Sequence, residues 1–267
     1  MNITSLNLFG RMDNWPDRQT RIIDYLDRAA PDIAFFQEVV YLPDVSPTTQ
    51  VTELNAILGY PYEHIAVTRL QTSDTYSEYR EGQGILSKYP IVKSETLVLR
   101  QHPEDHLQRI VQLVDVDYHG VIVQFANIQF AELPRHAGIH FKELIDILRA
   151  RDESRIILGD FNIPNIDIQV FRQLWEADYI SSSATPYISY PLMDTRVDYI
   201  LLPKAFAFEA ITVSSEGLSD HLALSATVTI PMPLLGELDS PSLTDDVDLD
   251  SAGVLHSALD LGSNIAR

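Results

Sequence analysis

The feature that most constrains the fold is a set of polar clusters, each at the C-terminal end of an apolar run or just past it. Each run has the length and composition of a buried strand. The clusters are Gln37-Glu38, Gly159-Asp160-Phe161-Asn162, Arg196-Val197-Asp198-Tyr199 and Ser219-Asp220-His221. Ionised groups beside a core are costly without a partner, because even an unpaired neutral polar group costs roughly 2–7 kcal/mol. Four strands that bring carboxylates, amides and an imidazole to one end of a sheet therefore predict a metal-dependent hydrolytic site.

The composition allows a large globular chain and excludes several kinds of chemistry. With 267 residues, 45% of them hydrophobic, the chain can bury a sizeable core as one large domain or two small ones. It has no cysteine, which excludes disulfides, thiolate metal sites and cysteine nucleophiles and suits a reducing compartment. The N-terminal residues lack the basic and apolar regions of a signal peptide, and no apolar run reaches the ~18 residues of a membrane helix. We therefore expect a cytoplasmic protein without stable membrane insertion, and no obligate protein partner is evident.

The charge argues against tight non-specific binding to long duplex DNA. The net charge is −19 and the pI about 4.6, whereas proteins that grip nucleic acid by phosphate neutralisation carry a basic face. Residues 233–267 hold seven acidic residues and one basic residue, so a charge of −13 falls on residues 1–232. The body of the chain is therefore acidic as well, although a local basic groove stays open.

The apolar spacing predicts helices and strands in mixed order rather than in strict alternation. The predicted helices are 17–29, 50–58, 136–150 and 167–175. The predicted strands are 2–8, 33–36, 62–69, 83–87, 92–99, 108–118, 120–130, 155–158, 197–202, 208–214 and 221–230. This order indicates an α+β domain over residues 1–232, with the strands stacked as two sheets and the helices outside. Residues 233–267 are rich in Pro, Asp, Ser and Leu and are expected to form an acidic tail, weakly ordered or loosely docked.

Two oxygen-bearing side chains near strand ends suit a magnesium ion. Mg²⁺ prefers octahedral oxygen coordination at roughly 2.0–2.1 Å and keeps several waters. Glu38 directly follows the apolar run 33–36 and Gln37, at the mouth of a buried strand, and is the main candidate ligand. Asn7 closes the first strand and can supply an amide oxygen. Taken alone, Glu38 could be half of a surface ion pair and Asn7 a turn former.

A carboxylate and an amide follow a glycine at the end of another buried strand. Gly159 permits unusual backbone angles, and Asp160 and Asn162 stand one and three residues after it. This pair can polarise an attacking water and hold a phosphate oxygen. The structural alternative is an Asx turn that reverses the chain.

An aspartate inside an apolar strand needs a partner when it is buried. Asp198 lies within the strand 197–202, and His221 is a natural partner. An Asp–His hydrogen bond fixes the imidazole tautomer and raises its basicity, as general-base chemistry requires. Asp220 could then face the metal while His221 faces the phosphorus. A lone histidine is more often structural, but the adjacent carboxylate and the strand aspartate favour a catalytic pair.

Six segments together resemble the endonuclease/exonuclease/phosphatase superfamily, which includes deoxyribonuclease-type nucleases, abasic-site endonucleases, neutral sphingomyelinases and inositol-polyphosphate 5-phosphatases. In the family's order they are Ser5-Leu6-Asn7, Phe36-Gln37-Glu38, Gly84-Ile85-Leu86-Ser87-Lys88-Tyr89-Pro90-Ile91, Leu158-Gly159-Asp160-Phe161-Asn162, Arg196-Val197-Asp198-Tyr199-Ile200-Leu201 and Leu218-Ser219-Asp220-His221. The resemblance implies a four-layer α/β/β/α sandwich, in which two facing mixed β-sheets are flanked by helices and the site lies at one edge.

The resemblance also assigns roles to the residues of these segments. The catalytic positions match His221, Asp160, Asp198 and Asn162, and the metal positions match Glu38, Asn7 and Asp220. Glu38 is the principal ligand, and Asp198 is the carboxylate that pairs with His221. Asp160 and Asn162 orient the nucleophilic water and hold the phosphate. The implied cofactor is Mg²⁺ or Mn²⁺.

Phosphate contacts are implied for Asn162, Arg109, Asn127 and Gln129, and the last departs from the family pattern. Many members carry a second histidine where this chain has Gln129. A glutamine can donate a hydrogen bond to a phosphoryl oxygen but cannot protonate a leaving group, and general acid catalysis contributes typically about 10²–10⁴-fold. Activity on poor leaving groups is therefore in question, although abasic-site endonucleases also lack this histidine.

The sequence as a whole predicts a divalent-metal-dependent phosphoester hydrolase, with a phosphodiesterase or nuclease favoured over a monoesterase. Its substrate would be nucleic acid or a small phosphodiester. One alternative is a phospholipid- or inositol-directed phosphatase or phosphodiesterase. Against it, the sequence lacks the basic patch that binding of inositol polyphosphates demands. The other is a catalytically weak binding protein, which Gln129 motivates.

Overall fold

The first sheet joins the two ends of the described chain. The computed structural model describes residues 1–70, 73–105 and 107–231. In spatial order this sheet consists of β11 (Ala207–Val213), β12 (Leu224–Thr229), β1 (Asn2–Asn7), β2 (Ile33–Tyr41), β4 (Arg80–Ser87) and β3 (Tyr62–Leu70). β1 and β2 run parallel, connected by α1 (Trp15–Ala29), and α2 (Gln50–Leu58) lies between β2 and β3 in the sequence.

The second sheet is built from the middle of the chain. In spatial order it consists of β5 (Ile91–Val98), β6 (Ile110–Tyr118), β7 (Val121–Gln129), β8 (Ile156–Asp160), β10 (Asp198–Pro203) and β9 (Tyr179–Ser181). The parallel pair β7 and β8 is connected by α3 (Pro134–Ala150), and α4 (Gln169–Trp175) follows β8. Two short 3₁₀ turns, Ser182–Ala184 and Pro191–Met193, lie between β9 and β10.

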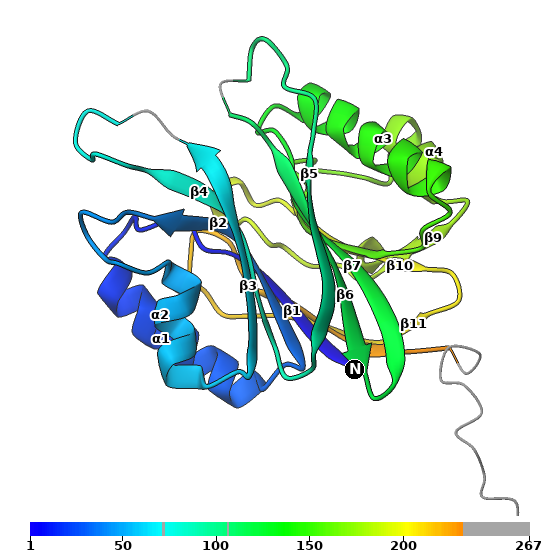
Figure 1. Ribbon diagram of the computed structural model, residues 1–267. Coiled ribbons are helices and arrows are strands. Elements are labelled where there is room, and N and C mark those ends of the chain that lie inside the picture. The colour runs from blue at the N-terminus through cyan, green and yellow to red at the C-terminus, as the bar shows by residue number, and fades with distance from the viewer. Residues whose placement is uncertain (71–72, 106, 232–267) are drawn as a thin grey trace, which may run out of the picture. The chain divides into compact units, whose positions relative to one another are not determined.

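Alternation along the central strands produces three apolar layers. Ile33 and Phe35 of β2 belong to the cluster between the sheets, whereas Ala34 and Phe36 belong to the cluster that contains α1 and α2 side chains. A third cluster joins the outer face of the second sheet to α3 and α4. Burial of each large apolar side chain contributes about 1.5–3 kcal/mol, so both faces of each sheet need a covering layer. Figure 1 shows the resulting order of helices, sheet, sheet and helices, which confirms the predicted four-layer sandwich.

Four details differ from the expectations. β2 does not end before Glu38; it continues to Tyr41 through an irregularity between Phe36 and Val39, where Glu38 has a positive φ of 51°. Asp198 opens its strand, and the last strand begins at Leu224, so the clusters at Asp198 and His221 precede strands instead of following them. They still reach the same edge, because β10 is antiparallel to β8 and β12 to β1. The short β9 was not predicted.

Two further expectations concern the C-terminal tail and membrane-spanning helices. The predicted acidic tail at 233–267 lies outside the described residues. In the described ranges, no helix is both long enough and apolar enough to cross a membrane.

Candidate active site

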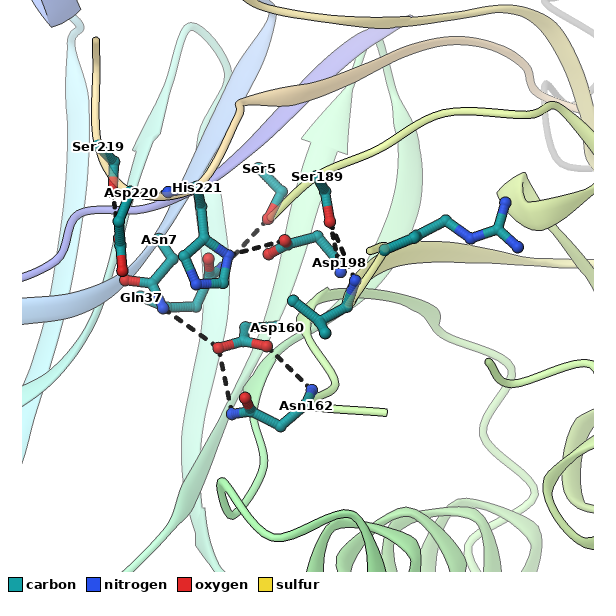
Figure 2. A network of polar contacts seen from close by, with 12 residues as sticks. Ser5, Asn7, Gln37, Asp160, Asn162, Ser189, Asp198, Ser219, Asp220 and His221 are labelled. Carbon is teal, nitrogen blue, oxygen red and sulfur yellow. Dashed lines mark hydrogen bonds and ion pairs between the residues drawn. The ribbon is translucent and has the colours of Figure 1, made fainter. Parts of the chain in front are cut away.

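A buried aspartate and a histidine form the centre of the site. Nδ1 of His221 lies 2.8 Å from Oδ2 of Asp198, and both side chains are buried (Figure 2). Asp198 is fixed through its backbone: the Oγ of Ser189 accepts hydrogen bonds from its N–H and from that of Val197, at 3.0 Å each. The hydroxyl of Tyr187 donates to the Asp198 carbonyl at 2.9 Å. With Nδ1 engaged, Nε2 of His221 is the ring nitrogen left for chemistry.

Asp160 lies at the end of β8, opposite Asp198 in the antiparallel register. Its Oδ1 accepts the backbone N–H of Asn162 at 2.9 Å, which is the Asx turn considered from the sequence. The Asn162 amide donates to Asp160 Oδ2 at 3.2 Å and to the Phe130 carbonyl at 3.1 Å, so both its amide hydrogens have protein acceptors. Gly159 makes the turn feasible, because its φ is 132° and a Cβ there would lie 2.1 Å from the Ile128 carbonyl oxygen. Asn162 thus holds Asp160 in place.

Two amides connect the carboxylates of the two sheets. Nδ2 of Asn7, at the end of β1, donates to Glu38 Oε1 at 3.0 Å and to Asp160 Oδ2 at 3.2 Å. Nε2 of Gln129, at the end of β7, donates to Glu38 Oε1 at 2.7 Å. The Asn7 oxygen accepts the backbone N–H of Phe9 at 2.9 Å, so the amide nitrogen of Asn7 faces the carboxylates. Among the described residues, no hydrogen bond uses the second oxygen of Glu38.

Asp220 is half-buried beside His221, and an arginine that the sequence analysis missed holds this loop. Ser219 Oγ donates to Asp220 Oδ1 at 3.0 Å. The buried guanidinium of Arg18, on α1, donates to the carbonyls of Leu8 at 2.7 Å and of Leu218 at 3.2 Å. It thereby ties the loop after β1 to the loop that carries Asp220 and His221. Arg18 sits on the polar side of a predicted helix, and no local signal distinguishes it from a surface arginine.

The charges of the site shift two pKa values strongly. Burial raises the pKa of Asp160 from 3.8 to about 7; the charge of His221 opposes this shift, and the negative charges of Asp198 and Glu38 add to it. Burial lowers the pKa of His221, but the charge and hydrogen bond of Asp198, with the charges of Asp160 and Asp220, outweigh it and raise this pKa to about 10. The site by itself therefore carries an excess of negative charge.

Several of these side chains line one cavity of about 670 Å³. It is lined by Phe9, Glu38, Glu132, Pro134, Asp160, Asn162, Pro164, Tyr190, Met193, Thr195, Val197, Asp220 and His221. The Tyr190 ring lies 4.8 Å from the His221 ring, centroid to centroid. The lining thus combines anionic and hydrogen-bonding side chains with apolar ones, and no lysine or arginine of the described residues belongs to it.

Two residues predicted to contact phosphate lie behind this lining. Arg109 is only 2% exposed and pairs with Asp105 at 3.7 Å and with Glu132 at 3.6 Å. Asn127 is fully buried between the sheets, where its oxygen accepts Gln37 Nε2 at 2.7 Å and its amide donates to Gln112 Oε1 at 3.0 Å. The Arg109 guanidinium thus faces two carboxylates of the protein, and the Asn127 amide is hydrogen-bonded within the protein. Gln129 likewise donates to Glu38 and is not among the cavity-lining residues.

The donor set fits a hard divalent cation. Glu38 and Asp220 present carboxylate oxygens to the cavity, and oxygen ligands are what Mg²⁺ and Mn²⁺ prefer. Burial, with the charges of Asp198 and Glu38, raises the pKa of Asp160, and the charge of Asp198 raises that of His221 against the effect of burial, so added positive charge is favoured in the site. A phosphoester anion would meet Glu38, Asp160 and Asp220 at close range, where like charges repel strongly in a partly dry cavity. A cation in this cavity would offset the excess negative charge and the repulsion of a phosphoester anion.

Comparisons with known proteins identify the family and agree with the fold. A family model described as Endonuclease/Exonuclease/phosphatase family matches residues 4–221. The structure of an endonuclease/exonuclease/phosphatase family protein from Leptotrichia buccalis C-1013-b covers 86% of this chain and 100% of its own, with 15% identity and a TM-score of 0.69. Mannosyl-6-phosphatase Bt3783 of Bacteroides thetaiotaomicron VPI-5482 matches over 86% of this chain and 100% of its own, with 15% identity and a TM-score of 0.63.

A protein solved in complex with DNA also shares the fold. D. rerio TDP2 complexed with single strand DNA product matches over 86% of this chain and 98% of its own, with 18% identity and a TM-score of 0.61. At such identities the structural similarity establishes the fold alone. A search of curated protein sequences found no match.

Proposed function

Because the chain belongs to the endonuclease/exonuclease/phosphatase family, we propose that it is a Mg²⁺- or Mn²⁺-dependent phosphodiesterase acting on nucleic acid or a small phosphodiester. Membership of this family supports phosphoester hydrolysis in general. The observation that carries the finer proposal is the His221–Asp198 hydrogen bond at the wall of a cavity that Asp160 and Glu38 share. We also propose that the protein acts in the cytoplasm; a chain without cysteine is compatible with that reducing compartment.

In this proposal His221 is the base that activates a water. Asp198 holds the ring through Nδ1 and stabilises the imidazolium that forms when Nε2 takes a proton. Asp160, held by Asn7 and by Asn162, orients the same water for in-line attack on phosphorus. Positioning of this kind contributes several kcal/mol, because it replaces a search in solution by a fixed geometry.

Glu38 and Asp220 would hold the cation. When bound, it supplies positive charge to the phosphoryl and leaving oxygens. Gln129 and Asn7 both donate to Oε1 of Glu38, which orients the carboxylate and leaves Oε2 for the cation. A cation held there would also lower the pKa of His221, which the charge and hydrogen bond of Asp198 raise to about 10 against the effect of burial.

The test is hydrolysis of an activated aryl phosphodiester by the full chain with Mn²⁺ or Mg²⁺. We expect turnover that requires the added ion and falls about 10²–10⁴-fold in His221→Ala, the range of general-base contributions. His119 is an exposed histidine in the turn between β6 and β7. His119→Ala is therefore the matched control and should keep full activity. No hydrolysis with either metal, or activity that His221→Ala leaves unchanged, would refute the proposal.

A second candidate is a phospholipid-directed phosphodiesterase, which is favoured by exposed apolar side chains at and beside cavity-lining residues. Leu192 and Met193 are 78% and 72% exposed, and Leu133 is also exposed beside the cavity residue Pro134. The absence of lysine and arginine from the described cavity lining disfavours inositol polyphosphates. Leu192→Asp should lower hydrolysis of phosphatidylcholine vesicles several-fold and leave a soluble aryl diester unaffected. Equal effects on both substrates would remove this candidate.

A further inference from the structure

Three side chains that do not line the proposed catalytic cavity converge at the start of α3. His102 and Glu104 lie in the loop between β5 and β6, and His136 lies in the first turn of α3. One ligand atom from each lies within 4.8 Å of the others. The rings of His102 and His136 stack with centroids 3.6 Å apart. None of the three lines the cavity, and none belongs to the motifs described above.

The buried histidine of this cluster has an unexplained polar atom. His136 is 1% exposed, and its Nδ1 has no hydrogen-bond partner among the described residues. A buried unpaired N–H of this kind costs about 1–3 kcal/mol, and the ring bears that cost with its other nitrogen, Nε2, directed at Glu104. Nε2 of His136 accepts a hydrogen bond from Arg135 Nε at 3.1 Å, so the proton of the neutral ring lies on Nδ1.

The accepting nitrogen of His136 faces a carboxylate. Its Nε2 lies 4.0 Å from Oε2 of Glu104. Two electron-rich atoms at this separation are unfavourable unless a positive charge lies between them. The Arg135 guanidinium supplies that charge, since it hydrogen-bonds both His136 Nε2 and Glu104. Its side chain is 65% exposed, so it can move into solvent at little cost.

We propose that His102, Glu104 and His136 bind a divalent transition-metal ion of the zinc class in place of the Arg135 guanidinium. Two imidazoles and one carboxylate are a ligand set that Zn²⁺ accepts, with water as the fourth ligand in a tetrahedral site. Imidazole nitrogen disfavours Mg²⁺, so this site and the oxygen-lined cavity select different ions. Binding opens the stacked rings, and the half-buried His102 on its loop is the one able to turn.

The site would brace the margin of the cavity. Asp105, next to Glu104, pairs with Arg109 at 3.7 Å, and Arg109 pairs with the cavity residue Glu132 at 3.6 Å. An ion that fixes His102 and Glu104 against α3 therefore lies two ion pairs from the cavity wall. Its role is structural, because no ligand of this ion reaches the cavity.

The experiment uses the tag-free full chain, stripped with a chelator and titrated with Co²⁺, with Zn²⁺ as competitor. Four-coordinate Co²⁺ with imidazole ligands absorbs visible light far more strongly than six-coordinate Co²⁺ with oxygen ligands. We expect one strongly absorbing Co²⁺ per chain, displaced by Zn²⁺ and retained in Glu38→Gln, which weakens only the cavity. His102→Ala, a half-buried loop position that does not endanger folding, should weaken this binding by at least 10–100-fold, roughly the penalty for losing even a ligand's supporting contact.

Three further variants complete the test. His136→Ala should lose the absorption as His102→Ala does, whereas Arg135→Ala should tighten binding because the competing cation is gone. His119→Ala is the matched histidine control and should bind as the unaltered chain does. The proposal is wrong if the unaltered chain shows no strong absorption, if His102→Ala binds normally, or if the absorption disappears in Glu38→Gln instead.

Discussion

Two β-α-β units, one from each sheet, supply the site with matching groups. In β1–α1–β2 the first strand ends in the amide Asn7, and the second presents the carboxylate Glu38. In β7–α3–β8 the first strand ends in the amide Gln129, and the second in the carboxylate Asp160. Each amide reaches the carboxylate of the other sheet: Asn7 donates to Asp160 at 3.2 Å and Gln129 to Glu38 at 2.7 Å. The two units are thus locked together across the sandwich.

The two carboxylates nevertheless differ in surroundings. Asp160 is 2% exposed, and burial raises its pKa to about 7. Glu38 is half-buried in the irregular part of β2, with one oxygen outside the hydrogen-bond network of the described residues. Gln37 is the register partner of Asn7 and Asp160 that of Gln129, so Glu38 lies one residue beyond the position that matches Asp160. In the proposed function the two carboxylates therefore take different roles: Glu38 holds the cation, and Asp160 orients the water.

The largest expected effect separates these two carboxylates. Asp160→Asn should lower kcat by about 10³-fold at any metal concentration, within the range for a positioned acid–base group. Glu38→Gln should cost about 10²-fold at limiting Mg²⁺ and recover in part with excess Mn²⁺, because it acts through the ion. Steady-state rates across a metal titration measure both. Equal recovery of the two variants would show that Asp160 also acts as a ligand.

A second prediction concerns what holds Asp220 on the cation-facing side. Arg18→Met leaves the buried carbonyls of Leu8 and Leu218 without their donor, so the free energy of unfolding should fall by roughly 3 kcal/mol. Denaturant unfolding measures the change. Arg172→Met is the control, because its ion pair with Glu176 is exposed and contributes less than about 0.5 kcal/mol. Equal losses in both variants would mean that the Arg18 contacts are not a major source of stability.

The layers of the fold could be predicted from local sequence, because alternation is a local property. In the run 33–36, Ile33 and Phe35 face the other sheet, and Ala34 and Phe36 face the helices. Burial on both faces makes such a strand continuously apolar, and this is the pattern the sequence displays. The same reasoning located Asp160 beyond an apolar run and singled out the glycine ahead of it, whose φ of 132° requires that residue.

Strand direction and long-range contacts could not be predicted in the same way. Nothing local shows that Asp198 opens its strand or that His221 precedes one; only antiparallel pairing with β8 and β1 brings them to the edge. The irregularity that turns Glu38 into the cavity depends on pairing with β4. Arg18 donates a hydrogen bond to a carbonyl 200 positions away, and Ser189 accepts backbone hydrogen bonds from residues 8 and 9 positions away. Neither residue is distinguished by its local sequence. Contacts of this kind follow from the whole fold.

A third, smaller effect tests the amide of the second unit. Gln129→His introduces a group that can protonate a leaving oxygen, so we expect a gain of about 10-fold on alkyl diesters and none on activated aryl diesters. Gln129→Leu is the control, and it should lose several-fold on both substrates because Glu38 loses a donor. Ratios of kcat/KM measure the difference. An unaltered chain without turnover that gains activity only in Gln129→His would instead identify the natural protein as a binding protein.

The last prediction concerns a pH-dependent difference in stability between the unaltered chain and Asp160→Asn, both treated with a chelator. The pKa of Asp160 is raised from 3.8 to about 7, so the folded state keeps a proton that the unfolded state releases. The stability that this proton provides is complete below pH 3.8 and is lost as pH rises through 7. The amide that Asp160→Asn introduces does not titrate, so the Tm of this variant relative to the unaltered chain should rise steadily across this window. Mg²⁺ should reduce the slope, since a nearby cation lowers the pKa of Asp160. A Tm difference that stays constant from about pH 4 to about pH 7 would show that the pKa of Asp160 is not raised in the folded protein.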